Sequence, residues 1–97
     1  MKIIIIGSGR VGSGLAKNLS LQGVDVSVID NDPETFKALG KSFKGQTFVG
    51  MAFDQKVLQA AGIEHADALA AVTTTDEINL VAARMAKTVY KVPSVAA

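Results

Sequence analysis

The sequence contains no cysteine and no tryptophan, and only two of its 97 residues are proline. Without cysteine the chain has no disulfide, no thiolate metal ligand and no thiol nucleophile. The isoleucine run at residues 3–6 is much too short to cross a bilayer or to form the core of a secretion signal. The chain also has no excess of charge of one sign, because the net charge is +1 and the ten lysines and arginines are scattered. We therefore expect no nucleic-acid partner, since such proteins carry a basic patch.

The composition that remains is that of an ordinary globular protein, with 48% apolar and 20% charged residues. A chain of this length buries about two-thirds of its unfolded surface. We expect one domain over residues 1–97, located in the cytoplasm, with any place at the inner face of the membrane supplied by a partner.

The strongest motif follows the isoleucine run and reads Gly7-x-Gly9-x-x-Gly12. In a nucleotide-binding turn each glycine has its own task. Gly7 allows a tight turn out of the strand, Gly9 allows a phosphate close to the backbone, and Gly12 allows the following helix to pack closely. Free N–H groups at the start of that helix, and its dipole, favour a phosphate. A purely structural glycine turn is the alternative.

Asp30 lies eighteen positions past Gly12 and closes the next strand-like run. In this context its carboxylate is expected to accept hydrogen bonds from the ribose hydroxyls of an adenosine nucleotide. It would also repel a 2′-phosphate, so NADP is not expected to bind. The alternative is an ordinary loop acid at the end of a strand. We expect Asp30→Ala to weaken binding with the fold retained.

Hydrophobic periodicity predicts alternating strands and helices with short connections. Strands are expected at residues 3–6, 24–30, 46–50, 68–72 and from 94 onward. Helices are expected at residues 10–22 and after caps at Asp32, Asp54 and Thr74, and Gly23 and Gly62 are expected to end two of them. Thr74 and Glu77 fit a capping box. This order predicts an α/β Rossmann-like fold, a doubly wound parallel sheet with strand order 3-2-1-4-5. It stops after strand five, which favours a piece cut from a longer chain.

Two helices are expected to bury apolar stripes. The residues expected on the inner faces are Val11, Leu15, Leu19, Gly12 and Ala16 in the first helix, and Ile78, Ala82, Met85 and Val89 in the last.

The candidate nucleotide-binding residues come from the ends of the predicted strands, where the ligand crevice of such sheets lies. They are Gly7, Ser8, Gly9, Arg10, Val11, Asp30, Asn31, Met51, Ala52, Thr73 and Thr74.

Several of these residues have a second interpretation. Arg10 either pairs with a phosphate or is a solvated residue of the first helical turn, and Val11 is expected mainly to pack. Thr74 either contacts the ligand or only caps a helix. Met51, like Phe53, either borders an adenine ring or belongs to the core.

Two further polar positions are expected to lie outside the site. Asp32 is expected to be a cap rather than a ligand contact. His65, the only histidine, is expected in a surface loop. We expect no catalytic residue and no metal site, because the acids near His65 lack a ligand spacing.

Beyond the glycines, the whole stretch from Lys2 to Ala97 resembles the RCK/KTN (TrkA-N) family of potassium-transport regulators. The residues that carry the resemblance are Val57-Leu58-x-x-Ala61-Gly62-Ile63-x-x-Ala66-Asp67-Ala68, Ala71-Val72-Thr73 and Asn79-Leu80-x-Ala82-Ala83. One departure is Gly50-Met51, because the family often has an acid after that glycine.

The resemblance implies a ligand-gated regulator without catalytic activity. Such a domain binds NAD(H) or an adenine nucleotide (ATP, ADP or AMP) and controls a membrane potassium channel or transporter subunit. The full-length protein is expected to form a homo-oligomer, a dimer or a ring. The alternative is the cofactor half of an NAD-dependent oxidoreductase. A passive assembly domain is a third reading, but it leaves the glycines and Asp30 unexplained.

Overall fold

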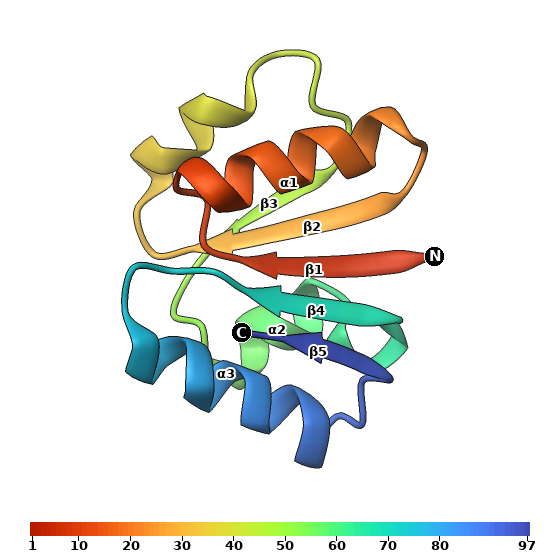
Figure 1. The fold of residues 1–97 in the computed structure, drawn as a ribbon, viewed down its shortest axis with the longest axis vertical. Helices are drawn as coiled ribbons and strands as arrows, with labels where there is room; N and C mark the ends of the chain where they lie inside the picture. Colours follow the sequence, from red (N-terminus) through yellow and green to blue (C-terminus); the bar gives the residue numbers. More distant parts are fainter.

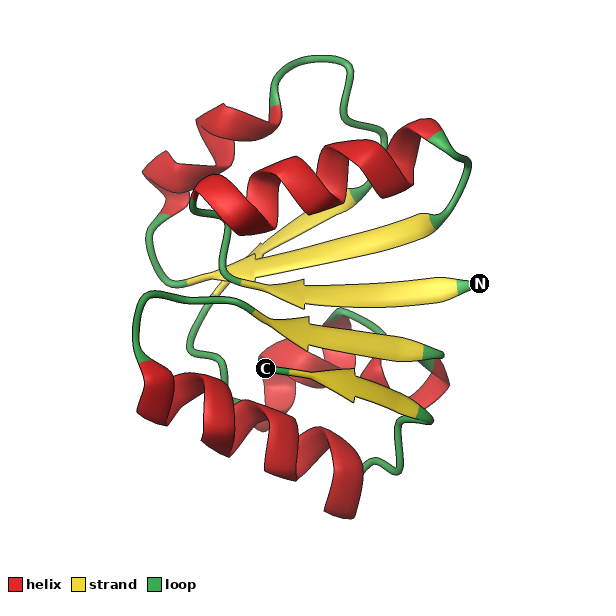
Figure 2. Ribbon diagram, viewed as in Figure 1, coloured by secondary structure: helices red, strands yellow, loops and turns green.

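The computed structural model describes all 97 residues and contains one sheet of five parallel strands (Figures 1 and 2). The strand order is β3-β2-β1-β4-β5, which confirms the predicted topology. The strands are β1 (Lys2–Ile6), β2 (Asp25–Asp30), β3 (Gln46–Val49), β4 (Ala68–Ala71) and β5 (Ser94–Ala96). The order reverses at β1, so β2 and β4 flank the strand that leads into the glycine motif.

The connecting segments are three α-helices and two short 3-10 helices. They are α1 (Arg10–Leu21), η1 (Pro33–Leu39), α2 (Gln55–Ala60), η2 (Ile63–His65) and α3 (Asp76–Thr88). α1 and η1 cover one face of the sheet, and α2 and α3 cover the other (Figure 1). None of these helices is both long enough and apolar enough to cross a membrane.

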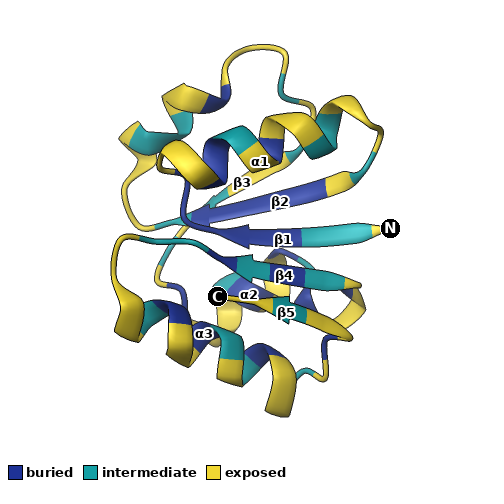
Figure 3. Cartoon of the chain, viewed as in Figure 1, coloured by how far each residue is buried: buried dark blue, intermediate teal, exposed yellow.

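The central strand β1 supplies side chains to two separate cores, one on each face of the sheet. The end of β1 that leads into the glycine motif is coloured as buried in Figure 3. Ile4 and Ile6 point to the larger core, beneath α2 and α3, whereas Ile5 points to the smaller one, beneath α1 and η1. All three are at most 1% exposed. Alternate side chains of a strand point to opposite faces, so the unbroken isoleucine run is what a strand covered on both faces requires.

Most of the predicted helix boundaries are confirmed. Asp32 Oδ1 accepts a hydrogen bond from Glu34 N–H at 3.0 Å, and Asp54 Oδ1 accepts one from Lys56 N–H at 2.9 Å. Gly23 has φ +83°, the left-handed conformation expected of a residue that ends a helix.

The predicted capping box at Thr74 is wrong. α3 begins one residue later, with Thr75 as its N-cap, and Thr75 makes no side-chain cap bond. The chain before α3 is instead held by Asn79, whose side chain bonds to Thr73. This longer-range interaction competes with the local capping box and replaces it.

Three predicted inner-face residues are exposed. Val11 is 66% exposed and Leu15 is 36% exposed, because the buried side of α1 is formed by Gly12, Ser13 and Ala16. Val89 is 56% exposed, because α3 ends at Thr88. The apolar spacing in these helices therefore identified the helices correctly but assigned their edges to the core.

Candidate functional site

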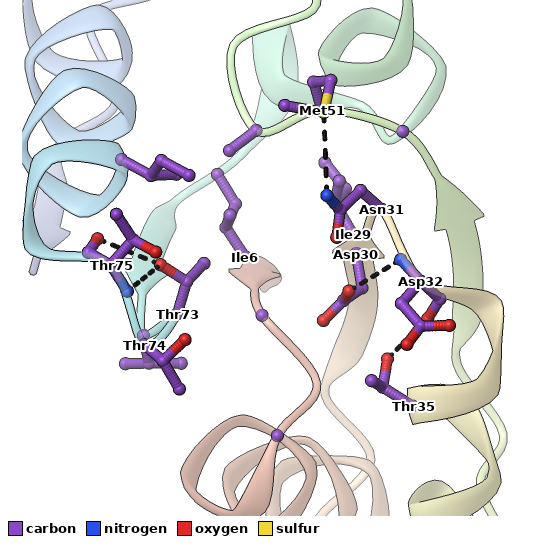
Figure 4. Close-up of a pocket in the computed structure, with 16 residues that line it drawn as sticks. Ile6, Ile29, Asp30, Asn31, Asp32, Thr35, Met51, Thr73, Thr74 and Thr75 are labelled. Atoms are coloured by element: carbon purple, nitrogen blue, oxygen red, sulfur yellow. Dashed lines mark hydrogen bonds between the residues drawn. The ribbon is translucent and has the colours of Figure 1, made fainter.

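A cleft of about 300 Å³ opens where the carboxyl ends of β1, β2 and β4 meet (Figure 4). The residues that line it are Ile6, Gly7, Gly9, Ile29, Asp30, Asn31, Asp32, Thr35, Gly50, Met51, Ala52, Val72, Thr73, Thr74, Thr75 and Ile78. In Figure 4 the residues from Asp30 to Thr35 lie on one side of Ile6 and those from Thr73 to Thr75 on the other. We call these sides the β2 wall and the β4 wall. Such a crevice at the point where the strand order reverses is where α/β sheets bind ligands.

The floor between the walls is the glycine turn, which leaves no room for other residues at two positions. Gly7 has φ +106°, and a Cβ there would lie 3.0 Å from the backbone of Val72 and Thr73. A Cβ at Gly12 would lie only 1.8 Å from the carbonyl oxygen of Gly7. Gly12 therefore allows α1 to start directly against the turn, as the sequence predicted.

At Gly9, by contrast, an added Cβ would meet no atom within 4 Å. Gly9 is the N-cap of α1 and offers no side-chain cap, so the N–H groups of residues 9–12 have no acceptor within the chain. Four free N–H groups at the positive end of a helix dipole are suited to holding an anion. Since Gly9 lines the cleft, a phosphate has both the donors and the space to approach them.

On the β2 wall, Asp30 is bonded to the glycine turn itself. Its Oδ2 accepts hydrogen bonds from Ser8 N–H at 2.8 Å and from the Ser8 hydroxyl at 3.1 Å. Its Oδ1 accepts one from Asp32 N–H at 2.9 Å. The Ser8 hydroxyl also contacts the Thr35 hydroxyl, which donates to the Asp32 carbonyl at 2.8 Å. The ends of β1 and β2 are thus joined into one unit.

These bonds leave Asp30 charged and partly available to a ligand. Burial is the largest single influence and would raise the pKa of Asp30. The hydrogen bonds from Ser8 N–H, Asp32 N–H and the Ser8 and Thr35 hydroxyls together outweigh it and lower the pKa below its ordinary value. A carboxylate accepts about four hydrogen bonds, so one position on Oδ1 remains open. A second opens on Oδ2 if the Ser8 hydroxyl turns to Thr35. Two adjacent hydroxyls of a ribose would match these positions.

On the β4 wall the anchor is neutral. Asn79 Oδ1 accepts hydrogen bonds from Thr73 N–H at 2.9 Å and from the Thr73 hydroxyl at 2.7 Å. Asn79 Nδ2 donates to the Thr73 carbonyl at 3.0 Å. These bonds fix the chain as it leaves β4, and neighbouring Thr74 lies exposed on the cleft wall.

The outer end of the β2 wall is formed by Asn31, Met51 and Ala52. The Asn31 amide lies 3.8 Å from Met51 Sδ, a weak hydrogen bond that brings the ends of β2 and β3 together (Figure 4). Met51 is 39% exposed and Phe53 is 44% exposed, so the interpretation of these two as core is wrong. Phe53 does not line the cleft, whereas Ala52 both lines it and belongs to the core.

Of the other candidates, Ser8, Arg10 and Val11 do not line the cleft. Ser8 is buried, and its N–H and hydroxyl are directed to Asp30 rather than toward a ligand. Arg10 is exposed and forms no ion pair within the chain, so its phosphate role stays a prediction. The prediction that the Val11 side chain packs is wrong, because that side chain is exposed. Only the backbone N–H of Val11, in the first turn of α1, remains a candidate for a ligand contact.

Sequence reasoning missed Thr35 and Asn79. Thr35 meets Ser8 only through the fold, and no local pattern indicates that contact. Asn79 carried a signal that could have been used, because it is a polar residue among the apolar positions of a helix. A buried amide needs partners, and at this position they are found at the end of the preceding strand. His65 is exposed as expected, although it lies in η2 rather than in a loop.

Two curated relatives match nearly the whole chain. A Trk system potassium uptake protein TrkA from Streptomyces coelicolor is 52% identical over 97 residues, which is 100% of this chain and 44% of that protein. The protein of the same name from Halomonas elongata is 40% identical over 94 residues, which is 97% of this chain and 21% of that protein. This chain thus spans less than half the length of each relative.

Solved structures share the same fold. The Kef C-terminal domain of Shewanella denitrificans, in an AMP-bound form, has a TM-score of 0.81 and 28% identity over 99% of this chain and 58% of its own. The TrkA-N domain of the inner membrane protein ybaL from Escherichia coli has a TM-score of 0.78 and 23% identity over 98% of this chain and 70% of its own, a likeness of fold alone.

The family model of the TrkA-N domain matches residues 3–97. The match covers all but the first residue of β1 and every later element through β5, and it confirms the resemblance that the sequence suggested. The chain belongs to the TrkA-N family.

Proposed function

We propose that the chain is the nucleotide-sensing domain of a regulator of potassium transport. The observation that carries this proposal is that Gly9, the first of four residues (9–12) with free N–H groups, lines the same cleft as a charged Asp30 that retains open acceptor positions. The first group suits a phosphate and the second suits a ribose. Together they match an adenosine nucleotide.

The ligand in this proposal is NAD(H) or an adenine nucleotide (ATP, ADP or AMP), all of which contain adenosine and a 5′-phosphate. An AMP-bound structural relative supports this class. The β2 wall disfavours NADP, because a 2′-phosphate would lie beside the carboxylates of Asp30 and Asp32, and no lysine or arginine lines the cleft.

In this proposal the domain lies on the cytosolic side of a membrane potassium channel or transporter subunit, within a homo-oligomeric full-length protein. It transmits its ligand state and catalyses no reaction. The names of the two TrkA relatives support the link to potassium uptake. A ligand shifts such a switch only by binding one conformation more tightly than the other.

Titration calorimetry of the chain with AMP, ATP, NADH and NADPH tests the binding step. We expect the first three to bind and NADPH to bind at least about tenfold more weakly, a difference of about 1.4 kcal/mol. NADPH binding as tight as NADH would contradict the role given to Asp30. Turnover of NADH with carbonyl substrates by the full-length protein would instead support an oxidoreductase.

Gly9→Val tests the proposed position of the phosphate in the same titration. An added Cβ meets no atom of the chain within 4 Å, so we expect the fold to be retained, while the valine side chain occupies the space through which a phosphate would approach. Binding of all four nucleotides should be lost. Gly14→Val is the matched control. Gly14 lies in α1, an added Cβ there also meets no atom within 4 Å, and the residue does not line the cleft. Normal binding by Gly9→Val would place the ligand elsewhere.

A further inference from the structure

The side chain of Asn79 forms hydrogen bonds to only one residue of the cleft, Thr73. It is 8% exposed and uses both acceptor positions of Oδ1 and one proton of Nδ2 on Thr73. An asparagine amide offers two acceptor positions and two donors, so three of its four hydrogen bonds go to Thr73. No other residue of α3 bonds to the β4 wall through its side chain.

These bonds determine which groups of the wall remain free. The Thr73 hydroxyl accepts a hydrogen bond from Thr75 N–H at 3.2 Å, so the residues on both sides of Thr74 are fixed. Thr74 itself makes no hydrogen bond within the chain, by its N–H or by its hydroxyl. Asn79 thus holds the loop so that the N–H and the hydroxyl of Thr74 are both free to donate hydrogen bonds at the cleft.

The β4 wall lies away from the groups that hold adenosine. β2 and β4 are on opposite sides of β1, and adjacent strands are about 4.8 Å apart, so the two walls are roughly 10 Å apart. A ligand with its ribose at Asp30 and its first phosphate over Gly9 would extend toward Thr74 with the part that continues past that phosphate. AMP ends there, whereas NADH continues with a second phosphate and a second nucleoside.

Building on the nucleotide site proposed above, we propose that Asn79 is a positioning residue for dinucleotides. It holds Thr73–Thr75 in the shape that contacts the part of the ligand beyond the first phosphate. The residue itself does not line the cleft and acts through Thr73. Asn79 therefore governs how well the domain separates NADH from AMP, whereas Asp30 serves both.

Asn79→Leu tests this role by removing all three bonds while retaining a side chain of similar size. We expect the Kd for NADH to rise about tenfold and the Kd for AMP to change less than about twofold. Thr73→Val retains the Thr73 N–H and carbonyl but loses the hydroxyl, and should raise the Kd for NADH about threefold. Calorimetry with both ligands, alongside thermal unfolding, gives the ratio of the two affinities.

Ala86→Gly is the control for loss of stability in α3. Ala86 is fully buried in the same helix, outside the cleft, and glycine there weakens the helix without touching Thr73. It should leave the NADH to AMP ratio unchanged. If Asn79→Leu changes both affinities equally, or neither, Asn79 is only structural and the proposal is overturned.

The wild-type chain supplies a measurement that requires no variant to fold. In NMR titrations, NADH should shift the Thr74 amide and the Asn79 side-chain amide, and AMP should leave both unshifted. Shifts at these groups with AMP, or none with NADH, would overturn the inference. Binding of AMP without NADH would overturn it and leave the nucleotide site standing, whereas binding of neither would overturn both.

Discussion

The two walls of the cleft are each held by one side chain that bonds to backbone outside its own element, Asp30 to Ser8 and Asn79 to Thr73, but the anchors differ in charge. On the β2 wall the anchor is the carboxylate of Asp30, which lines the cleft and retains acceptor positions for a ligand. On the β4 wall the anchor is the neutral amide of Asn79, which lies behind the surface. In the proposed function, Asp30 thus both stabilises its wall and contacts the ligand, whereas Asn79 only stabilises its wall.

The partners of the two anchors differ as well. Asp30 ties the end of β2 to Ser8, within the turn that would hold phosphate, so the proposed ribose and phosphate sites are joined by hydrogen bonds. Asn79 ties the end of β4 to α3, whose outer side carries the exposed Leu80 and Val81. Substitutions in the β2 wall should therefore weaken the binding of every adenosine nucleotide. The β4 wall is connected instead, through α3, to exposed residues on the surface of the domain.

The largest effect is expected where the glycine turn between the two walls is disturbed, at Gly12. In Gly12→Ala the new Cβ would lie 1.8 Å from the Gly7 carbonyl oxygen, a backbone atom that cannot move without shifting the turn. We expect a loss of about 3 kcal/mol of unfolding free energy or more, with loss of all nucleotide binding. Chemical denaturation measures the first and calorimetry the second.

Gly14→Ala is the matched control for this change. Gly14 lies in the same helix, and nothing lies within 4 Å of an added Cβ. It should stabilise the chain by roughly 0.5–1 kcal/mol, because alanine favours a helix interior. A Gly12→Ala variant as stable as wild type would show that α1 can start further from the turn.

A smaller effect is expected when only the β2 wall is broken. Asp30→Ala should raise the Kd values for AMP and NADH by the same factor, about tenfold. It also leaves the buried Ser8 N–H without its acceptor, at a cost of about 1–3 kcal/mol of stability. The structure thus adds a stability loss to the sequence-based expectation that the fold is simply retained.

Asp54→Ala separates the two consequences. Asp54 caps α2 and does not line the cleft, so its removal should cost about 1 kcal/mol of stability and leave both Kd values unchanged. If Asp30→Ala weakened only one of the two nucleotides, Asp30 would belong to a more specialised subsite than the ribose of the shared adenosine.

The smallest effect is a pH dependence that only the charged wall should show. The pKa of Asp30 is lower in the folded chain than its ordinary value, so its hydrogen bonds add stability above the ordinary aspartate pKa of about 3.9. That contribution is lost as the pH falls through the lower, folded-state pKa. Wild type and Asp30→Asn should therefore converge in stability in acid, whereas wild type and Asn79→Leu should keep a constant difference. Denaturation at a series of pH values measures both.

The sequence predicted the β2 wall better than the β4 wall, for a physical reason. Asp30 closes a strand whose place beside β1 follows from the topology, so its position at the cleft could be expected. Its bonds to Ser8 could not, because they depend on how two strand ends meet in space. At Thr74 a local rule was available and gave the wrong cap, because three consecutive threonines offer equivalent local choices and the side chain of Asn79, within α3, decides among them by bonding to Thr73.

The bonds between Asp30 and Ser8 are made entirely within the chain, which has a consequence for signalling. A recognition surface already assembled by its own contacts requires little ordering when a nucleotide arrives, so less binding free energy is lost to immobilising it. Such a surface also changes its conformation little when a ligand binds. In the proposed function, a conformational change is then better carried by the β4 wall, where Thr74 makes no side-chain hydrogen bond and Asn79 connects the loop to α3.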